Sequence, residues 1–333
     1  MGFWDGKRVL VAGGAGFIGS HLVELLLKAG RGVQVTVADD LSNGHRENLD
    51  GAGGVRLEVV DLRDRQACRK VCRRQDVAFH LAARVGGVGY NSAHPGTMFH
   101  DNIALCGSMM EAARLEKVER VLVVSSACVY PRFCTVPTPE TEGFKDWPED
   151  TNEGYGWAKR MAEFQAMAYL KEFGMRFAIV RPYNAYGPRD HFGSETSHVI
   201  PSLIRRILSG EDPLRVWGDG TQTRSFLYAE DAARGMLAVS EKYAECDPVN
   251  IGTDEEVRIS ELVRLILELL GRKPKVEFDP SKPSGQPRRS CDTRKAAEKA
   301  DFRSRVPLRE GLERTISWIL KHPARLRRVT EPA

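Results

Sequence analysis

Four side chains with complementary chemistry lie close together in the sequence. Ser126 and Cys128 end an apolar run, and Tyr155 and Lys159 follow in the order Tyr-x-x-x-Lys. Residues four apart share one face of a helix, so we expect the Lys159 ammonium to lower the pKa of the Tyr155 phenol. Such a tyrosine can exchange a proton with a hydroxyl group that Ser126 also binds. The set predicts hydride transfer at a carbinol carbon, and Cys128 adds proton abstraction beside the resulting ketone.

These side chains require a scaffold that brings strand ends and helices together. Apolar, β-branched segments alternate with helical patterns through the first half of the chain. Because parallel strands need crossover connections, the alternation predicts an α/β fold with a Rossmann-type doubly wound parallel sheet. The expected strands are 7–12, 33–38, 55–60, 77–81, 121–125 and 177–181, and the first expected helix is 21–29.

The pattern changes after residue 186. Helical segments at 199–209, 231–239 and 260–270 alternate there with short strands near 214–217 and 248–251. We therefore predict a dinucleotide-binding domain over 1–186, with some later segments interleaved, and a smaller α/β substrate lobe formed mainly by 187–333.

A glycine-rich turn separates the first strand from the first helix. Gly13, Gly16 and Gly19 are spaced G-x-x-G-x-x-G, with Phe17 and Ile18 between the last two. Glycines allow a tight turn, and they let backbone N–H groups and the positive end of a helix reach a pyrophosphate. The position of the turn predicts a dinucleotide site.

Asp39 ends the second expected strand, twenty residues after Gly19. A carboxylate there can accept the hydroxyls of an adenosine ribose and repel a 2′-phosphate, which favours NAD over NADP. Arg46 is the nearest later cation and would soften that preference. A plain polar turn is the alternative interpretation. Further cofactor contacts are expected at the ends of the third and fourth strands, from Asp61, Leu62, Leu81, Ala82 and Ala83.

Bulk properties favour an ordinary globular protein. The chain has 333 residues, 42% hydrophobic residues and a net charge of +4, which calls for no nucleic-acid partner. No stretch approaches the roughly 18 apolar residues that a membrane span needs. The seven cysteines are odd in number and scattered, which predicts free thiols in a reducing cytoplasm and no metal site.

Together these motifs resemble the extended short-chain dehydrogenase/reductases of the nucleotide-sugar epimerase/dehydratase class. The resemblance extends from Gly13 to Trp318 and includes Arg181-Pro182-Tyr183-Asn184, Tyr186-Gly187-Pro188 and 217–226. It implies a Rossmann domain, a lobe that binds a nucleoside diphosphate sugar, and a homodimer formed through a four-helix bundle containing the Tyr155 helix.

Cys128 narrows the resemblance to two subfamilies, GDP-L-fucose synthase and GDP-mannose 3,5-epimerase. Residues 83–87 and 197–201 are similar to the synthase, whereas 125–131 and 218–226 are closer to the epimerase. His198 stands where the synthase has histidine and the epimerase lysine. The resemblance also implies that Arg224 binds the diphosphate, with Asn184, Arg206 and Arg289 as further substrate residues. Surface charge is the alternative for Arg206 and Arg289.

These features predict an NAD-dependent nucleotide-sugar epimerase, with a GDP-hexose as the favoured substrate. A C4 ketone acidifies the hydrogens at C3 and C5, and inversion needs a base on one ring face and an acid on the other. A thiol and an imidazole suit these roles near neutral pH, so Cys128 and His198 are expected to exchange the protons. The alternatives are a GDP-L-fucose synthase-type 3,5-epimerase/4-reductase using NAD(P)H, a simple C4 epimerase, and a sensor that binds nucleotide sugars without turnover.

Overall fold

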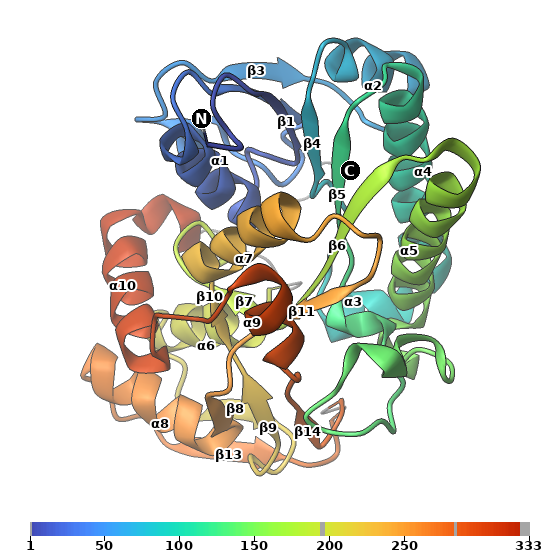
Figure 1. Ribbon diagram of the computed structural model, residues 1–333. Helices are drawn as coiled ribbons and strands as arrows, with labels where there is room; N and C mark the ends of the chain where they lie inside the picture. Colours follow the sequence, from blue (N-terminus) through green and yellow to red (C-terminus); the bar gives the residue numbers. More distant parts are fainter. Residues whose placement is uncertain (1, 194–196, 283–284, 327–333) are drawn as a thin grey trace.

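The main sheet of the protein is parallel and surrounded by helices (Figure 1). A computed structural model describes residues 2–193, 197–282 and 285–326, and within them seven strands pair in the order β11-β6-β5-β4-β1-β2-β3. The strands are β1 (Arg8–Ala12), β2 (Gln34–Asp39), β3 (Arg56–Val59), β4 (Val77–His80), β5 (Arg120–Val124), β6 (Arg176–Pro182) and β11 (Val249–Ile251). The expected fold class is confirmed.

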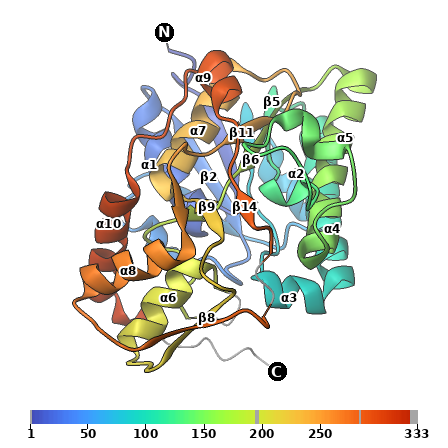
Figure 2. The ribbon, with the colours of Figure 1, turned by 90° about the horizontal axis from the view of Figure 1, so that it is seen from below.

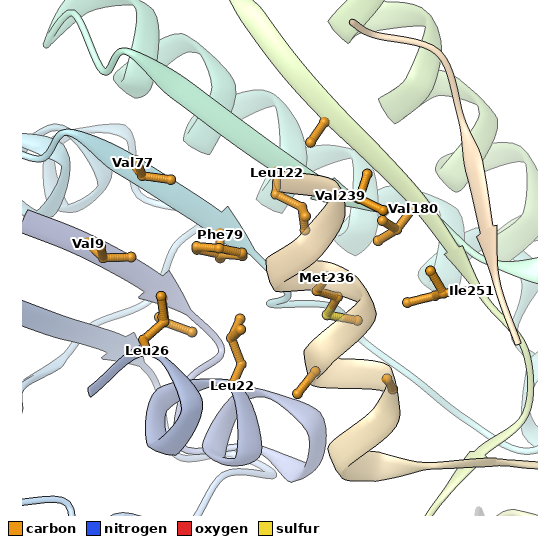
Figure 3. Close-up of a cluster of buried hydrophobic side chains, with 14 of the residues drawn as sticks. Val9, Leu22, Leu26, Val77, Phe79, Leu122, Val180, Met236, Val239 and Ile251 are labelled. Atoms are coloured by element: carbon orange, nitrogen blue, oxygen red, sulfur yellow. The ribbon is translucent and has the colours of Figure 1, made fainter. Parts of the chain in front are cut away.

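Alternating side chains of each strand build two cores, one on each face of the sheet. Val9 and Val11 of β1 lie in the core under α1 (Phe17–Ala29), α7 (Ala229–Lys242) and α9 (Arg294–Ala300), as Figure 3 shows in part. Leu10 and Ala12 lie in the core under α2 (Arg65–Cys72), α4 (Pro95–Leu115) and α5 (Glu153–Phe173). This alternation is what an extended strand with both faces covered requires.

The order in which strands are added to the sheet changes direction at β1. Strands β2 and β3 lie on one side of β1, and β4, β5 and β6 lie on the other. In doubly wound sheets, ligands bind in the crevice at the carboxyl ends of the strands, at the point where the strand order changes direction. The bounds of the expected and observed strands agree to within a few residues. The expected catalytic side chains follow β5 and therefore lie near this edge of the sheet.

A second group of elements forms a lobe from the later part of the chain (Figure 2). Its core joins α6 (Val199–Leu208), α8 (Ile259–Leu270) and α10 (Leu308–Lys321) with the parallel pair β8 (Leu214–Trp217) and β13 (Val276–Asp279). The later elements β11, α7 and α9 return to the main sheet, and the domain boundary at residue 186 stays a prediction. No helix in the described ranges is long and apolar enough to cross a membrane.

Small elements complete the lobe and the loops around it. Strand β9 (Thr223–Ser225) pairs with β12 (Glu256–Arg258) on one side and β14 (Arg288–Arg289) on the other, and β7 (Ala185–Tyr186) pairs with β10 (Leu227–Tyr228). The remaining helices are α3 (Val88–Ala93) and the 3-10 turns Arg46–Leu49, Ala127–Val129, Glu140–Phe144, Asp150–Asn152 and Pro323–Leu326.

A buried ion pair joins α5 to β6 beneath the catalytic segment. The fully buried Glu163 carboxylate lies 2.6 Å from a guanidinium nitrogen of Arg181 and also accepts a hydrogen bond from Ser125. Arg181 further donates to the Tyr130 hydroxyl at 3.0 Å and to the Glu140 carbonyl at 2.7 Å. Removing one member of such a pair leaves an uncompensated buried charge.

Replacing Glu163 by alanine is therefore expected to lower the free energy of unfolding by about 3–5 kcal/mol. Chemical denaturation of the Glu163→Ala protein measures this loss. Glu268 provides a matched control, because its pair with Arg309 is solvent-exposed on both sides. The Glu268→Ala change should cost no more than about 1 kcal/mol. Equal losses in the two variants would contradict the role given to the buried pair.

Candidate active site

The glycine-rich turn packs against the end of β4. Gly13 has a φ of +80°, and a Cβ atom there would lie 2.7 Å from the Ala82 nitrogen. A Cβ atom on Gly19 would lie 2.1 Å from the Gly13 carbonyl oxygen. Only glycine fits these two positions, and the turn then runs directly into the first turn of α1. The backbone therefore forms the kind of cradle that suits a pyrophosphate.

Asp39 lies at the end of β2, as a ribose-binding carboxylate requires. Its oxygens accept hydrogen bonds from the Ala15 nitrogen at 3.0 Å and the Leu41 nitrogen at 2.9 Å. Burial raises the pKa of Asp39, while these N–H donors act in the opposite direction. The Gly16 N–H is a third backbone donor, and a carboxylate with about four lone-pair sites can still accept a ribose hydroxyl. Gly44 was not predicted from the sequence as a residue of this site. A Cβ atom at Gly44 would lie 2.6 Å from Asp39 Oδ1.

The other expected cofactor residues occupy more varied positions. The Asp61 carboxylate is exposed and held by Arg63, with its oxygens 3.0 Å from Nε and 2.7 Å from Nη2. The Leu62 side chain is buried in the core shared with α2, so only its backbone is open to a cofactor. Half-buried residues at the end of β4 and in the first turn of α1 remain beside the cradle, namely Leu81, Ala83, Phe17 and Ile18.

The expected catalytic residues Ser126, Tyr155 and Lys159 meet at the carboxyl end of β5. Ser126 Oγ accepts a hydrogen bond from the Cys128 nitrogen at 3.1 Å and is also hydrogen-bonded to the Tyr155 hydroxyl. Lys159 Nζ lies 5.4 Å from the centre of the Tyr155 ring and donates to the Val124 carbonyl at 2.8 Å. The three side chains therefore face one space, as their spacing predicts.

The expectation of a lowered pKa for Tyr155 is wrong for the protein alone. Burial raises the pKa of Tyr155, and the hydrogen bond from Ser126 only partly opposes this. The cause is the cost of moving a phenolate out of water. Burial likewise lowers the pKa of Lys159 to about 8, because it disfavours the ammonium.

Cys128 and His198 are connected through Arg289. The Arg289 guanidinium donates to Cys128 Sγ at 3.5 Å, and its charge also acts on His198. Cys128 is half-buried, whereas the His198 side chain, at the start of α6, is 48% exposed. Arg289 therefore contacts one of these two residues and acts electrostatically on the other, although they are 70 positions apart in the sequence.

Two arginines form an anion-binding feature near Cys128. Arg224 of β9 and Arg289 of β14 are paired in the parallel register of the two strands. Burial lowers the pKa of Arg224 to about 10, and the like charge of Arg289 acts in the same direction. Neighbouring guanidinium groups suit a diphosphate, which each can bind in a bidentate manner.

The structure gives the other two expected substrate residues local partners. The Asn184 amide donates to the Ser225 carbonyl at 2.9 Å and so ties β7 to β9. Arg206 is paired with Glu211, with Nε to Oε2 at 2.7 Å, and it also donates to the Arg215 carbonyl. These contacts account for both side chains without a ligand, and their substrate roles stay predictions.

Sequence reasoning missed a buried carboxylate near the arginines. Glu149 acts electrostatically on both Arg224 and Arg289, and its Oε1 lies 3.9 Å from Arg132 Nη1. Within the described part of the chain, that oxygen has no hydrogen-bond partner. The sequence feature that could have indicated Glu149 is its position in the segment that leads directly to Tyr155.

Comparisons with known proteins agree with this geometry. Residues 9–252 match the NAD dependent epimerase/dehydratase family. The chain is 32% identical over 324 residues to a GDP-L-fucose synthase of Sinorhizobium fredii, covering 96% of this chain and 98% of that protein. It is 34% identical over 325 residues to a dTDP-4-dehydro-6-deoxy-D-allose reductase of Streptomyces, with the same coverage.

Two further likenesses extend the comparison. The chain is 31% identical over 320 residues to a GDP-mannose 3,5-epimerase of Oryza sativa, covering 95% of this chain and 83% of that protein. The UDP-glucose 4-epimerase of Thermotoga maritima, solved with UDP-glucose, superposes with a TM-score of 0.86 at 30% identity, covering 95% of this chain and 99% of that one. The chain therefore belongs to the NAD dependent epimerase/dehydratase family and is an NAD(P)-dependent nucleotide-sugar enzyme.

Proposed function

We propose that the protein is an NAD-dependent nucleotide-sugar epimerase that works through a C4-keto intermediate and exchanges protons at C3 and C5. The supporting observation is the position of Arg289, which donates to the Cys128 thiol beside Ser126 and acts electrostatically on His198. A simple redox reaction at C4 would need neither the thiol nor the imidazole.

The residues divide the chemistry between two positions on the sugar. Tyr155 takes the proton of the C4 hydroxyl, Ser126 holds the same oxygen, and Lys159 keeps a cation beside the ring of Tyr155. The nicotinamide of bound NAD supplies hydride transfer at C4. Once C4 is a ketone, Cys128 and His198 act as base and acid at the adjacent carbons.

Recognition of the substrate rests on the arginine pair. Arg224 and Arg289 hold the diphosphate in this proposal, and Glu149 provides a buried negative charge that offsets part of their repulsion. We favour a GDP-sugar because two of the relatives described above carry GDP in their names. The dTDP-sugar reductase relative makes a thymidine nucleotide the second base to test.

A net 4-keto reductase is the second candidate. It is supported by His198 and by the names of two relatives, a GDP-L-fucose synthase and a dTDP-sugar reductase. This enzyme would consume reduced cofactor in every turnover. A simple C4 epimerase, as the UDP-glucose 4-epimerase is by name, would leave Cys128 without a role.

Incubation in D2O separates these functions. The protein is given GDP-mannose, GDP-4-keto-6-deoxymannose or dTDP-4-dehydro-6-deoxy-D-allose, with and without NADPH, and the sugars are analysed by NMR. Deuterium at C3 or C5 of GDP-mannose without cofactor consumption supports the epimerase. Oxidation of NADPH in step with product formation supports the reductase. Inversion at C4 with protium retained at both neighbours would contradict the role of Cys128.

Asp39 makes NAD the proposed cofactor over NADP. Its replacement by serine removes two charged hydrogen-bond acceptors, so the Kd for NAD should rise on the order of 10–100-fold. NADP should lose less, because the repulsion of its 2′-phosphate also disappears. Calorimetric titration measures both constants, with Asp40→Ser as the matched control, since Asp40 is exposed and bonds to Ser42. Equal affinity of the unmodified protein for NAD and NADP would overturn this assignment.

We also propose a cytoplasmic homodimer. Four apolar side chains of α5 are exposed, namely Phe164, Met167, Leu170 and Phe173, and Phe99 is exposed on the adjacent α4. Two copies of the α4–α5 pair would bury part of this apolar surface in a four-helix bundle. Sedimentation as a monomer at micromolar concentration would contradict the dimer. All seven cysteines are free, which fits a reducing compartment.

A further inference from the structure

We infer that Asp190 is a positioning residue for His198, fixing the orientation and charge of the imidazole that exchanges a sugar proton. The inference rests on the proposed function and deepens it, because nothing above explains how an exposed histidine is held. Asp190 Oδ1 lies 3.8 Å from His198 Nδ1, and the Asp190 side chain is only 3% exposed. An aspartate that engages Nδ1 leaves Nε2 as the nitrogen available to a substrate.

The carboxylate has free capacity for this contact. Asp190 Oδ1 already accepts a hydrogen bond from the His191 nitrogen at 2.7 Å. Asp190 Oδ2 is buried and has no hydrogen-bond partner among the described residues. A buried carboxylate oxygen without a partner is costly, so a small rotation that brings Nδ1–H of His198 into hydrogen-bond range is favourable.

The segment that carries Asp190 is fixed from the cofactor side of the molecule. The Pro188 carbonyl lies 3.0 Å from His21 Nε2, Arg189 is paired with Glu24, and His191 Nε2 lies 2.9 Å from Asn43 Oδ1. Asp190 is therefore an anchored partner, whereas His198 stands at the exposed start of α6. An anchored carboxylate can impose one ring orientation on an exposed histidine.

The surrounding charges favour the same arrangement. Partial burial of the ring would lower the pKa of His198, but the nearby Asp190 carboxylate outweighs this and raises it. Arg289 opposes Asp190, and among the described residues His191 also interacts electrostatically with the ring. Asp190 is the one anion among these groups, so it favours the charged form of the imidazole against the nearby guanidinium.

Histidine NMR titration of the ligand-free protein tests the pairing directly. The His198 signal is assigned by its loss in His198→Asn, and its pKa is compared between the unmodified protein and Asp190→Asn. Removing the charge is expected to lower the pKa of His198 by about one to three units. Asp190→Glu should restore part of the shift. Glu24→Gln is the control, because it releases the Arg189 anchor and leaves the carboxylate in place.

The pH dependence of deuterium uptake then connects the pairing to the reaction. In a plot of kcat against pH, the limb that belongs to His198 is the one that disappears in His198→Asn. This limb should move to lower pH in Asp190→Asn, with little change in KM for the sugar. An unchanged His198 titration in Asp190→Asn would overturn the inference and leave Asp190 a loop residue. A shifted titration, combined with normal deuterium uptake by His198→Asn, would instead overturn the proposed function and remove Asp190 from the exchange reaction.

Discussion

The Tyr155→Phe protein is expected to fold and to bind nucleotide normally while losing about 10²–10⁴-fold in kcat. Phenylalanine keeps the ring beside Lys159 but removes the hydroxyl that takes the C4 proton in the proposed mechanism. Loss of the hydroxyl removes the proton transfer at C4 and should therefore affect kcat much more than KM.

Steady-state kinetics on the sugar that is turned over measures this loss. Tyr169→Phe is the matched control, since Tyr169 lies on the same helix and donates to the Glu111 carboxylate at 3.0 Å. It should keep the activity of the unmodified protein within a few fold. Retention of high activity by Tyr155→Phe, or equal losses in both variants, would remove Tyr155 from the reaction.

Local sequence patterns were sufficient for the fold. Helix α6 was expected at 199–209 and spans Val199–Leu208, and strand β5 was expected at 121–125 and spans Arg120–Val124. These elements are specified by nearby apolar residues at periods of 3.6 and 2, which are properties of the segment itself. The glycine turn and the Tyr155 helix were predictable from local motifs, the glycine spacing and the Tyr-x-x-x-Lys pair.

Contacts between distant segments were not predictable in this way. Arg289 reaches Cys128 only because the two-residue strand β14 pairs with β9, and 161 positions separate the two residues. Neither the apolar pattern nor the charge pattern encodes that return of the chain. Asp190 and Glu149 were missed because their importance comes from buried, unpartnered oxygens, and burial of a single loop residue depends on the whole fold.

Cys128 carries the second large prediction. Replacing it by serine should reduce deuterium uptake at C3 and C5 by about 10²–10⁴-fold, because a hydroxyl is a far weaker base than a thiolate. Serine keeps a small polar side chain beside Arg289, so the fold and the diphosphate site should persist. The C4 hydride step uses Ser126, Tyr155 and Lys159 and should continue, which single-turnover nicotinamide absorbance can follow.

Cys134→Ser is the matched control. It shows whether the loss of deuterium uptake follows from removing Cys128 or from removing any thiol nearby. Cys134 is half-buried in the following loop and lies 3.5 Å from Thr138 Oγ1. Its replacement should leave deuterium uptake unchanged. If Cys128→Ser keeps full uptake, then the thiol is only a neighbour of Arg289 and His198 alone exchanges protons. If it loses uptake and the C4 step together, then the Cys128 side chain supports the geometry of the neighbouring Ser126 rather than acting on C3 or C5.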